Sequence, residues 1–254
     1  GTANVAIGHA ALEDSNGANY NTAVGYGSLR DNTTADNNTA FGYHSLKTNT
    51  TGVNNVAVGH SAVDANTTGV NNVGLGTNAL SANTTAEANT AVGTNALMVN
   101  TTGAYNVAVG MSALDANTTA ASNTAIGYGS LTANTTGAEN TVVGKDAMVD
   151  NTTGGSNTAL GKSALGNNTT ASNNVAIGHG AMFDNTTGTS NTAIGYTALG
   201  DNTTASNNTA VGYLSLRLST GAYNTAVGSL ALDANTTGAG NTGVGYNSLS
   251  ANTT

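Results

Sequence analysis

The sequence predicts an all-β protein, a parallel β-solenoid in which each tandem repeat forms one coil. Three observations predict this class: an unbroken tandem repeat, a period-two apolar pattern inside each repeat, and a nearly uncharged composition. The motif Asn-(Thr/Val)-(Ala/Gly/Val)-aliphatic-Gly occurs fifteen times, from Asn4 to Asn241. Successive motifs begin seventeen residues apart, as Asn4 and Asn21 do. The motifs at Asn208 and Asn224 are the exception, since they begin one residue closer together. We therefore expect residues 1–254 to form a single solenoid array of fifteen coils.

The repeat length decides between helical and β architectures. Two-helix repeats need more than about 30 residues, so a repeat as short as this one excludes the helical solenoids. We number each repeat from its leading Asn, so coil 1 begins at Asn4, coil 2 at Asn21 and coil 15 at Asn241. One coil buries too few side chains to be stable alone, so we expect the coils to stack and stabilise their neighbours.

Each element of the coil follows from its residue types. Positions 2 to 4 predict a strand whose Thr or Val and whose aliphatic residue point inward, and the invariant Gly at position 5 predicts a turn or close approach. A second short strand is expected at positions 7 to 10, with the aliphatic residue of position 9 inward. The Asn-Thr-Thr segment at positions 12 to 14 closes the coil. The expected structural ladders include Asn21, Val24, Gly25, Leu29, Asn38, Phe41, Gly42, Leu46, Asn191, Ile194, Gly195 and Leu199.

Position 3 is a column of small apolar residues that would point opposite to positions 2 and 4. An exposed strand face usually carries polar residues, so this column predicts a surface covered by a parallel copy of the chain. The alternative is that Ala is simply tolerated at position 3 on a strand face that is exposed to solvent. The expected oligomer face comprises Ala23, Ala40, Ala57, Ala91, Ala108, Ala125, Ala193 and Ala210.

Composition excludes several classes of function. Charged residues make up 7% of the chain, against about 25% in ordinary globular proteins, because like charges stacked in register would repel each other. The net charge of −8, without basic clusters, argues against nucleic-acid binding. No apolar run is long enough for a transmembrane helix, so we expect no membrane insertion. The chain has no Cys, which rules out disulfides.

No constellation of catalytic or metal-binding residues is visible, and we expect a protein that is not an enzyme and uses no cofactor or metal. The four His residues are His9, His44, His60 and His179, and their spacing places none of them in a metal-ligating group. Tyrosines recur at position 6, where they form either a corner-packing ladder or a glycan-binding stripe: Tyr26, Tyr43, Tyr128, Tyr196, Tyr213 and Tyr246. The thirteen Asn-Thr-Thr triplets are either polar turn ladders or N-glycosylation sites.

The run Asn191-Thr192-Ala193-Ile194-Gly195-Tyr196, with Ala198-Leu199 and Asn202-Thr203-Thr204, resembles the β-roll repeats of phage tail fibres. It is also similar to the head repeats of trimeric autotransporter adhesins, whose Ser-Val-Ala-Ile-Gly core is close to Asn4-Val5-Ala6-Ile7-Gly8. The resemblance implies a left-handed parallel β-roll, a homotrimeric rod, and a place on a virion tail or cell surface. The best-known adhesin repeats are shorter than the repeat of this chain. We expect the chain to be a segment of a longer fibrous protein.

The function expected from these observations is that of an extracellular structural and adhesive fibre, a tail-fibre or adhesin shaft that spaces or presents a binding tip. Its expected partners are further copies of the chain and a host-surface glycan or receptor. The alternatives are a solenoid face that binds polysaccharide or ice, and a self-assembling extracellular filament.

Overall fold

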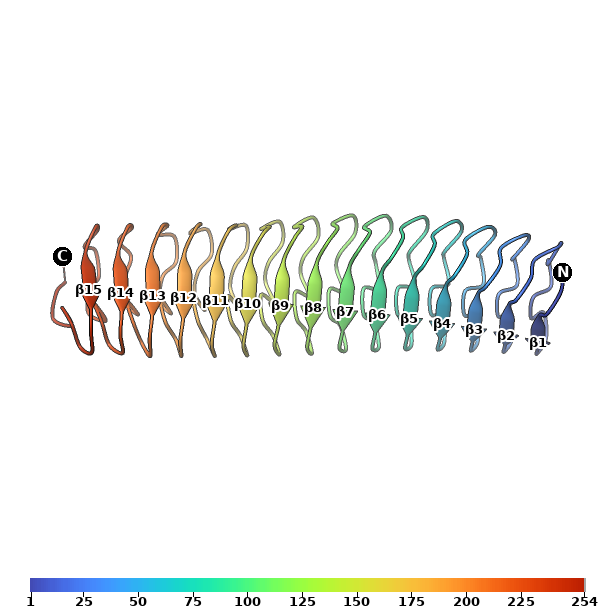
Figure 1. Cartoon of the computed structure of the whole chain (residues 1–254), viewed down its shortest axis with the longest axis horizontal. Coiled ribbons are helices and arrows are strands. Elements are labelled where there is room, and N and C mark those ends of the chain that lie inside the picture. Colours follow the sequence, from blue (N-terminus) through green and yellow to red (C-terminus); the bar gives the residue numbers. More distant parts are fainter. Residues whose placement is uncertain (254) are drawn as a thin grey trace. The chain divides into compact units, whose positions relative to one another are not determined.

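The computed structural model describes residues 1–253 and, within them, consists of three-residue strands joined by turns, with no helix (Figure 1). Each repeat contributes one strand, so the chain has fifteen strands in sequence order. The chain divides into two compact units, Gly1–Asn123 and Thr124–Thr254. The prediction of an all-β solenoid whose coils each span one repeat is confirmed.

The strand bounds follow the repeat in both units. The first unit contains β1 (Val5–Ile7), β2 (Thr22–Val24), β3 (Thr39–Phe41), β4 (Val56–Val58), β5 (Val73–Leu75), β6 (Thr90–Val92) and β7 (Val107–Val109). The second unit contains β8 (Thr124–Ile126), β9 (Thr141–Val143), β10 (Thr158–Leu160), β11 (Val175–Ile177), β12 (Thr192–Ile194), β13 (Thr209–Val211), β14 (Thr225–Val227) and β15 (Thr242–Val244).

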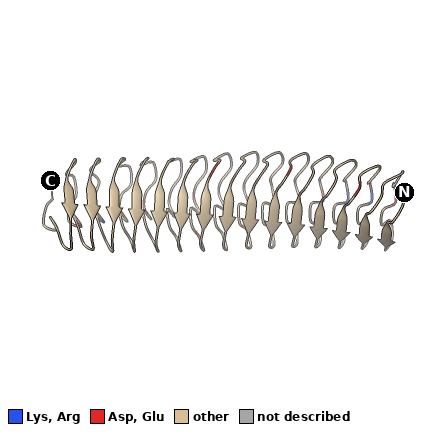
Figure 2. Ribbon diagram, in the orientation of Figure 1, with Lys and Arg blue, Asp and Glu red and all other residues tan. Residues whose placement is uncertain are grey.

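Within each unit, neighbouring strands pair in parallel with equivalent positions opposite one another. In the first unit Ala6 faces Ala23 and Ala23 faces Ala40, and in the second Ala176 faces Ala193 and Ala193 faces Ala210. The shorter coil 13 keeps this register, since Ala210 faces Ala226. Charged residues lie on the turns and none lies in a strand, so the stacked strands avoid like-charge columns (Figure 2).

The core of each coil is narrow, and its apolar side chains come mainly from positions 3, 8 and 9. Ala91, Ala96 and Leu97 of coil 6 are all completely buried, and the same positions are buried through most of both units. A Cβ atom added to Gly74, at position 3, would lie 2.5 Å from Cγ2 of Val63 at position 9. Position 3 therefore packs directly against the position 9 side chains, and Ala is there because little more fits.

The predicted orientation of the strand is wrong, and the predicted inward ladders are correct only for some positions. The leading Asn and the position 9 aliphatic side chains are buried, as expected for Asn21, Asn38, Asn191, Leu29, Leu46 and Leu199. Positions 2 and 4 point outward, so Val24 is half-buried while Phe41 and Ile194 are exposed. The expected oligomer face lies inside the coil: Ala23, Ala40, Ala57, Ala91, Ala108, Ala125, Ala193 and Ala210 are completely buried.

The predicted second strand is also wrong, because positions 6 to 11 form turns. Position 9 has a positive φ in all fifteen coils, including Leu97 at 51° and the β-branched Val63 at 52°. Such residues rarely adopt this left-handed conformation, which costs about 1–2 kcal/mol per residue. It lets the Leu97 N–H donate to the carbonyl of Ala113 in the next coil at 2.9 Å while the side chain points into the core.

Two buried Asn columns hold each coil closed and join it to the next. In coil 3 the Nδ2 groups of Asn38 and Asn49 both donate to the carbonyl of Gly52, each at 2.9 Å. The Oδ1 atom of Asn38 accepts the backbone N–H of Asn55, and the Nδ2 group of Asn49 also donates to Oδ1 of Asn32 in the preceding coil. The amides therefore supply both donors and acceptors along the stack, which an uncharged side chain of this kind allows.

Candidate interaction surfaces

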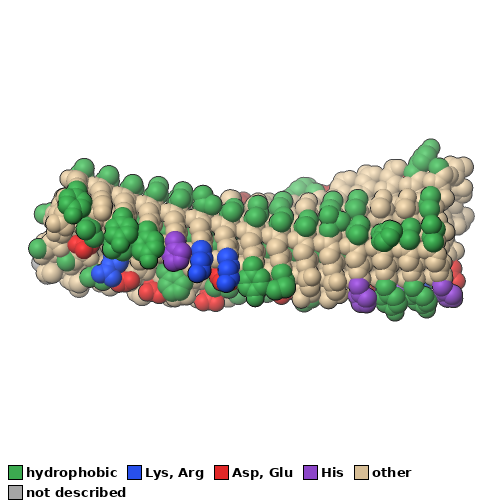
Figure 3. Space-filling view, turned by 90° about the horizontal axis from the view of Figure 1, so that it is seen from below, with side chains coloured by type: hydrophobic (Ala, Val, Ile, Leu, Met, Phe, Trp, Pro, Cys, Tyr) green, Lys and Arg blue, Asp and Glu red, His purple; other side chains and the backbone are tan. Residues whose placement is uncertain are grey.

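The outward side of the strands forms an apolar surface in each unit, which we call the strand face and define as positions 2 and 4 of the coils. Ile7 is 60% exposed, Phe41 55% and Leu160 46%. The other exposed apolar members are Val5 and Val58 in the first unit and Ile126, Ile194, Val227 and Val244 in the second. Figure 3 shows hydrophobic side chains aligned in rows over neighbouring coils. Contiguous exposed apolar surface of this kind is typical of an interaction site.

The strand face replaces the surface that the sequence pattern indicated. Position 3, which is mostly Ala, lies on one side of the strand. Positions 2 and 4, which carry Thr or Val and the larger aliphatic residues, lie on the other side, so only one of the two sides can face outward. The core accepts the smaller residues because so short a coil leaves little room between the strand and positions 8 and 9. The larger side chains are left on the surface, half-buried by their neighbours above and below.

The predicted tyrosine column forms stacked rings. Tyr26 and Tyr43 lie 5.4 Å apart, centroid to centroid, with an angle of 12° between the rings, and His9 and His60 extend this stack at 5.1 Å at either end. In the second unit, His179, Tyr196 and Tyr213 stack at 5.4 and 5.5 Å. Neighbouring rings cover one another's faces, so solvent meets mainly ring edges. This arrangement favours ladder packing over a continuous sugar-stacking platform.

The remaining members of the column have other surroundings. The Lys145 ammonium lies 5.6 Å from the ring centroid of Tyr128, a cation–π contact, and Tyr246 is largely exposed. His44 lies against Tyr43, with the ring centroids 3.9 Å apart, so His44 and His60 contact the same tyrosine. Burial lowers the pKa of His44, and the positive charge of Lys47 adds to this effect. Residues 1–253 contain no cluster of three or more metal-ligating side chains.

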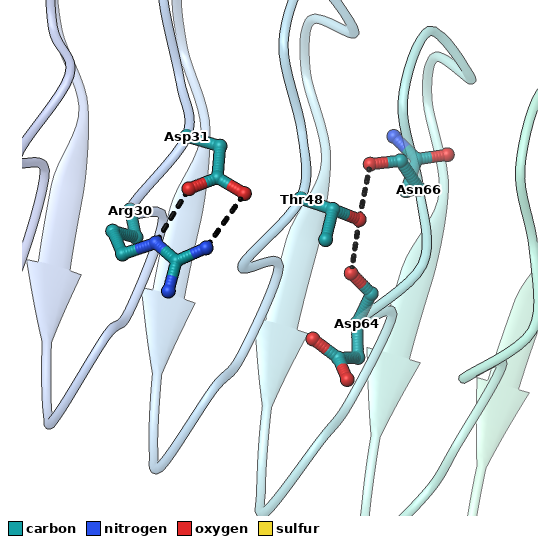
Figure 4. Close-up of polar contacts among 5 residues, drawn as sticks. All are labelled: Arg30, Asp31, Thr48, Asp64 and Asn66. Atoms are coloured by element: carbon teal, nitrogen blue, oxygen red, sulfur yellow. Dashed lines mark hydrogen bonds and ion pairs between the residues drawn. The ribbon is translucent and has the colours of Figure 1, made fainter.

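Two acidic side chains at position 10 are partly buried. Oδ1 of Asp64 and Oδ1 of Asp115 are inaccessible to solvent and have no hydrogen-bond partner. Burial raises the pKa of both carboxyl groups, and Lys47 opposes this effect at Asp64. The backbone carbonyl of Asp64 accepts a hydrogen bond from Thr48 Oγ1 at 2.5 Å (Figure 4). Asp64 is thus held in place by its main chain while its carboxylate is poorly solvated.

Nearby, Arg30 and Asp31 form a bidentate ion pair on the surface. Nε of Arg30 donates to one Asp31 oxygen at 2.5 Å, and a terminal nitrogen donates to the other at 3.1 Å (Figure 4). This pairing compensates the Asp31 charge, whereas the Asp64 carboxylate makes no such contact.

Replacing Asp64 with Ser, the residue at this position in coil 5, is expected to raise the melting temperature at pH 7. A carboxyl group whose folded pKa is raised binds a proton more tightly in the folded state. Its charged form therefore destabilises the fold, increasingly so as pH rises from the unfolded pKa through the folded pKa. The gain should disappear near pH 3, where the carboxyl is neutral in both states. Thermal unfolding of wild type, Asp64→Ser and the exposed control Glu13→Ser across this pH range measures the difference, and an equal gain at pH 3 and pH 7 would contradict it.

Twelve of the thirteen Asn residues of the Asn-Thr-Thr triplets are buried, all except Asn252. Asn49, Asn66 and Asn83 are completely inaccessible, and their Nδ2 groups are already donors to backbone carbonyls in the same coil. An attached glycan would displace these hydrogen bonds. Of the two interpretations of these triplets, polar turn ladders and N-glycosylation sites, the folded coil favours the polar ladders.

No helix in residues 1–253 is long and apolar enough to cross a membrane. Fold and surfaces together define the chain as a parallel β-solenoid repeat protein with an exposed apolar strand face. Comparison of the chain with models of protein families, with curated proteins and with solved structures found no match. The relation to tail-fibre and adhesin repeats therefore stays a prediction from the residues.

Proposed function

We propose that the chain is a segment of an extracellular structural and adhesive fibre in which parallel copies pack through their strand faces. The observation that carries this proposal is the exposed apolar surface formed by positions 2 and 4. It recurs in coil after coil within each unit and includes Ile7 and Phe41 in the first unit and Leu160 in the second. The proposed role is mechanical and uses no catalytic residue.

The energetics favour packing along many coils over a local contact. Fully burying one aliphatic side chain contributes about 1.5–3 kcal/mol, and these side chains are already partly covered, so each offers a fraction of that value. Association of two proteins costs about 4–15 kcal/mol in lost freedom and ordering. One coil cannot offset this cost, but a long row of coils can. A regular array of coils is therefore suited to forming a shaft.

Three chains per shaft, a left-handed roll and a place on a virion tail or cell surface are the further parts of the proposal. They rest on the resemblance of Asn191–Tyr196 and its neighbours to tail-fibre and adhesin repeats. In such a shaft the three strand faces would meet around a common axis, and the turns would face the surroundings. The binding tip for a host glycan or receptor would lie elsewhere in the fibre.

Sedimentation velocity at micromolar concentration tests this assembly. We expect a species of three times the chain mass of 24.7 kDa. The double variant Phe41→Lys, Val58→Lys should weaken the assembly, because it places charges on the strand face that burial would have to desolvate. The control Thr85→Lys, at an exposed turn of the same unit, should assemble like the wild type. A wild-type protein that sediments as a stable monomer would refute the proposal. Electron micrographs of the assembled protein should show thin rods.

Ice binding is the second candidate, because the strand face carries Thr and Val at position 2 in an in-register parallel array. An ice-binding surface needs a regular arrangement of identical side chains. Here position 2 alternates between Thr39 and Val56, and position 4 includes the larger Phe41 and Leu75. This irregularity favours the packed interface. Thermal hysteresis in a monomeric preparation would reverse that choice.

A further inference from the structure

A hollow of about 330 Å³ lies on the turns of coils 10 to 12 in the second unit. Its lining includes Lys162, His179, Phe183, Asp184 and Asp201, together with glycine and hydroxyl residues from the same three coils. It lies on the turns, at positions 6 to 11, and so is separate from the strand face at positions 2 and 4. Its volume is at the lower end of the range for ligand sites, about 300–1,000 Å³.

The hollow arises where the repeat departs from its pattern. Position 10 is occupied by a side chain in every coil except coils 10 and 12, which carry Gly166 and Gly200 on either side of Phe183. A Cβ on Gly166 would lie 2.7 Å from Cε2 of the Phe183 ring, so this glycine makes room for the ring. The three atoms nearest to a Cβ on Gly200 all belong to Thr197 of its own coil, and the closest, Cγ2, would lie 2.4 Å away. Gly200 lines the hollow, and its lack of a side chain leaves space there.

The polar groups around Phe183 include both hydrogen-bond donors and acceptors. Oδ1 of Asp184 accepts a hydrogen bond from Asn167 Nδ2 at 3.0 Å, and Oδ2 of Asp201 lies 3.9 Å from an Arg217 nitrogen. These contacts hold both carboxylates while leaving each with further acceptor positions. Lys162 and His179 are exposed at position 6 of coils 10 and 11, line the same hollow and supply donors. Phe183 is 39% exposed.

We propose that this hollow binds a saccharide unit, with one face of the sugar on Phe183 and its hydroxyl groups on Asp184, Asp201, Lys162 and His179. A sugar combines an apolar C–H face with hydroxyls that both donate and accept, and this lining offers a counterpart to each. A phosphate would face two carboxylates and is disfavoured, while a purely apolar ligand would leave four polar side chains without partners. The site goes beyond the proposed fibre role, which places recognition at a separate tip.

The chain contains only two phenylalanines, Phe41 and Phe183, so fluorine labelling reports on the site directly. Protein grown with 4-fluorophenylalanine should give two ¹⁹F resonances, one from the hollow and one from the strand face. The probes are the methyl glycosides of glucose, galactose, mannose and N-acetylglucosamine, with sodium glutamate and inorganic phosphate for comparison. We expect at least one glycoside to shift the Phe183 resonance with a dissociation constant on the order of 1 mM, while the Phe41 resonance stays in place.

Gly200→Met fills the open side of the hollow with a residue that coil 6 carries at the same position, Met98, and should reduce the response at least tenfold. The matched control Val149→Met makes the same side chain at position 10 of coil 9 and should leave the response intact. The resonances identify whether each variant is folded, independent of binding. The proposal is overturned if no glycoside moves Phe183, if glutamate or phosphate moves it as strongly, if Phe41 moves equally, or if Gly200→Met responds like the wild type.

Discussion

Replacing Gly93 with Ala is expected to lower the free energy of unfolding of the first unit by about 3 kcal/mol or more. Gly93 lies at position 5 of coil 6, where φ is 131°, a region that residues with a Cβ rarely adopt. The added Cβ would also lie 2.7 Å from the backbone carbonyl carbon and oxygen of Gly110 in the next coil. Backbone strain and the clash add together, because neither coil can move without breaking the hydrogen bonds that join them.

The matched control lies in the same coil. Gly103, at position 15, has an ordinary φ. A Cβ built on its present backbone would lie 2.1 Å from the carbonyl oxygen of Ala120, but Ala86 and Ala120 occupy this position in the coils on either side, so a small shift of the turn accommodates a Cβ here. Gly103→Ala should therefore change stability by less than about 1 kcal/mol. Urea denaturation followed by circular dichroism measures both variants. Equal stability of Gly93→Ala and Gly103→Ala would show that the close approach of neighbouring coils at position 5 is not real.

Replacing Asn83 with Asp is expected to lower the free energy of unfolding by about 3–5 kcal/mol at pH 7. Asn83 is completely buried, and its Nδ2 group donates to Asn66 Oδ1 at 2.8 Å and to the Ala86 carbonyl at 3.2 Å. A carboxylate would direct its oxygens at these two acceptors and would carry an unpaired charge in the core. One substituted atom thus breaks a hydrogen-bond ladder and buries a charge.

The control for this variant is Asn78→Asp in the same coil. Asn78 is half-exposed at position 7, and the equivalent residue of coil 9 is Asp146. We expect a change below about 0.5 kcal/mol there. The damage at Asn83 should lessen at acidic pH, because a buried carboxyl group takes up a proton more readily in the folded than in the unfolded state. A loss at Asn83 that equals the loss at Asn78 would mean that the Asn columns do not stabilise the coils.

Much of the fold was predictable because the same residue pattern recurs in all fifteen repeats. The spacing of Asn21, Asn38 and Asn55 fixes the length of one coil, and in-register stacking follows because only that register places equivalent residues opposite one another. The invariant Gly at position 5 indicated a backbone constraint, and the structure supplies it as a close contact between coils. For the Asn-Thr-Thr triplets the sequence left two interpretations, polar ladders and N-glycosylation sites, and the buried hydrogen bonds of Asn49 and Asn66 favour the ladders.

The conformation of position 9 was not predictable from the residues found there. Leu97 and Val63 belong to types that avoid positive φ, so nothing in their identity indicated a left-handed turn, and the alternation of residues favoured a strand instead. The hollow around Phe183 could have been noticed from Gly166 and Gly200, since position 10 carries glycine nowhere else. Its depth and its lining depend on how three coils stack.

The sequence alone determined the repeat, its one strand per coil, and which columns are invariant. The direction in which each column points was decided only by the tertiary structure. Period-two alternation shows that positions 2 and 4 share one side of the strand and Ala91 of position 3 the other, but it does not say which side is inside. The width of the coil settles that question: Leu97 fills the interior across from the strand, only small residues pack against it, Ala in most coils and Val142 in coil 9, and the larger aliphatic residues are left facing outward.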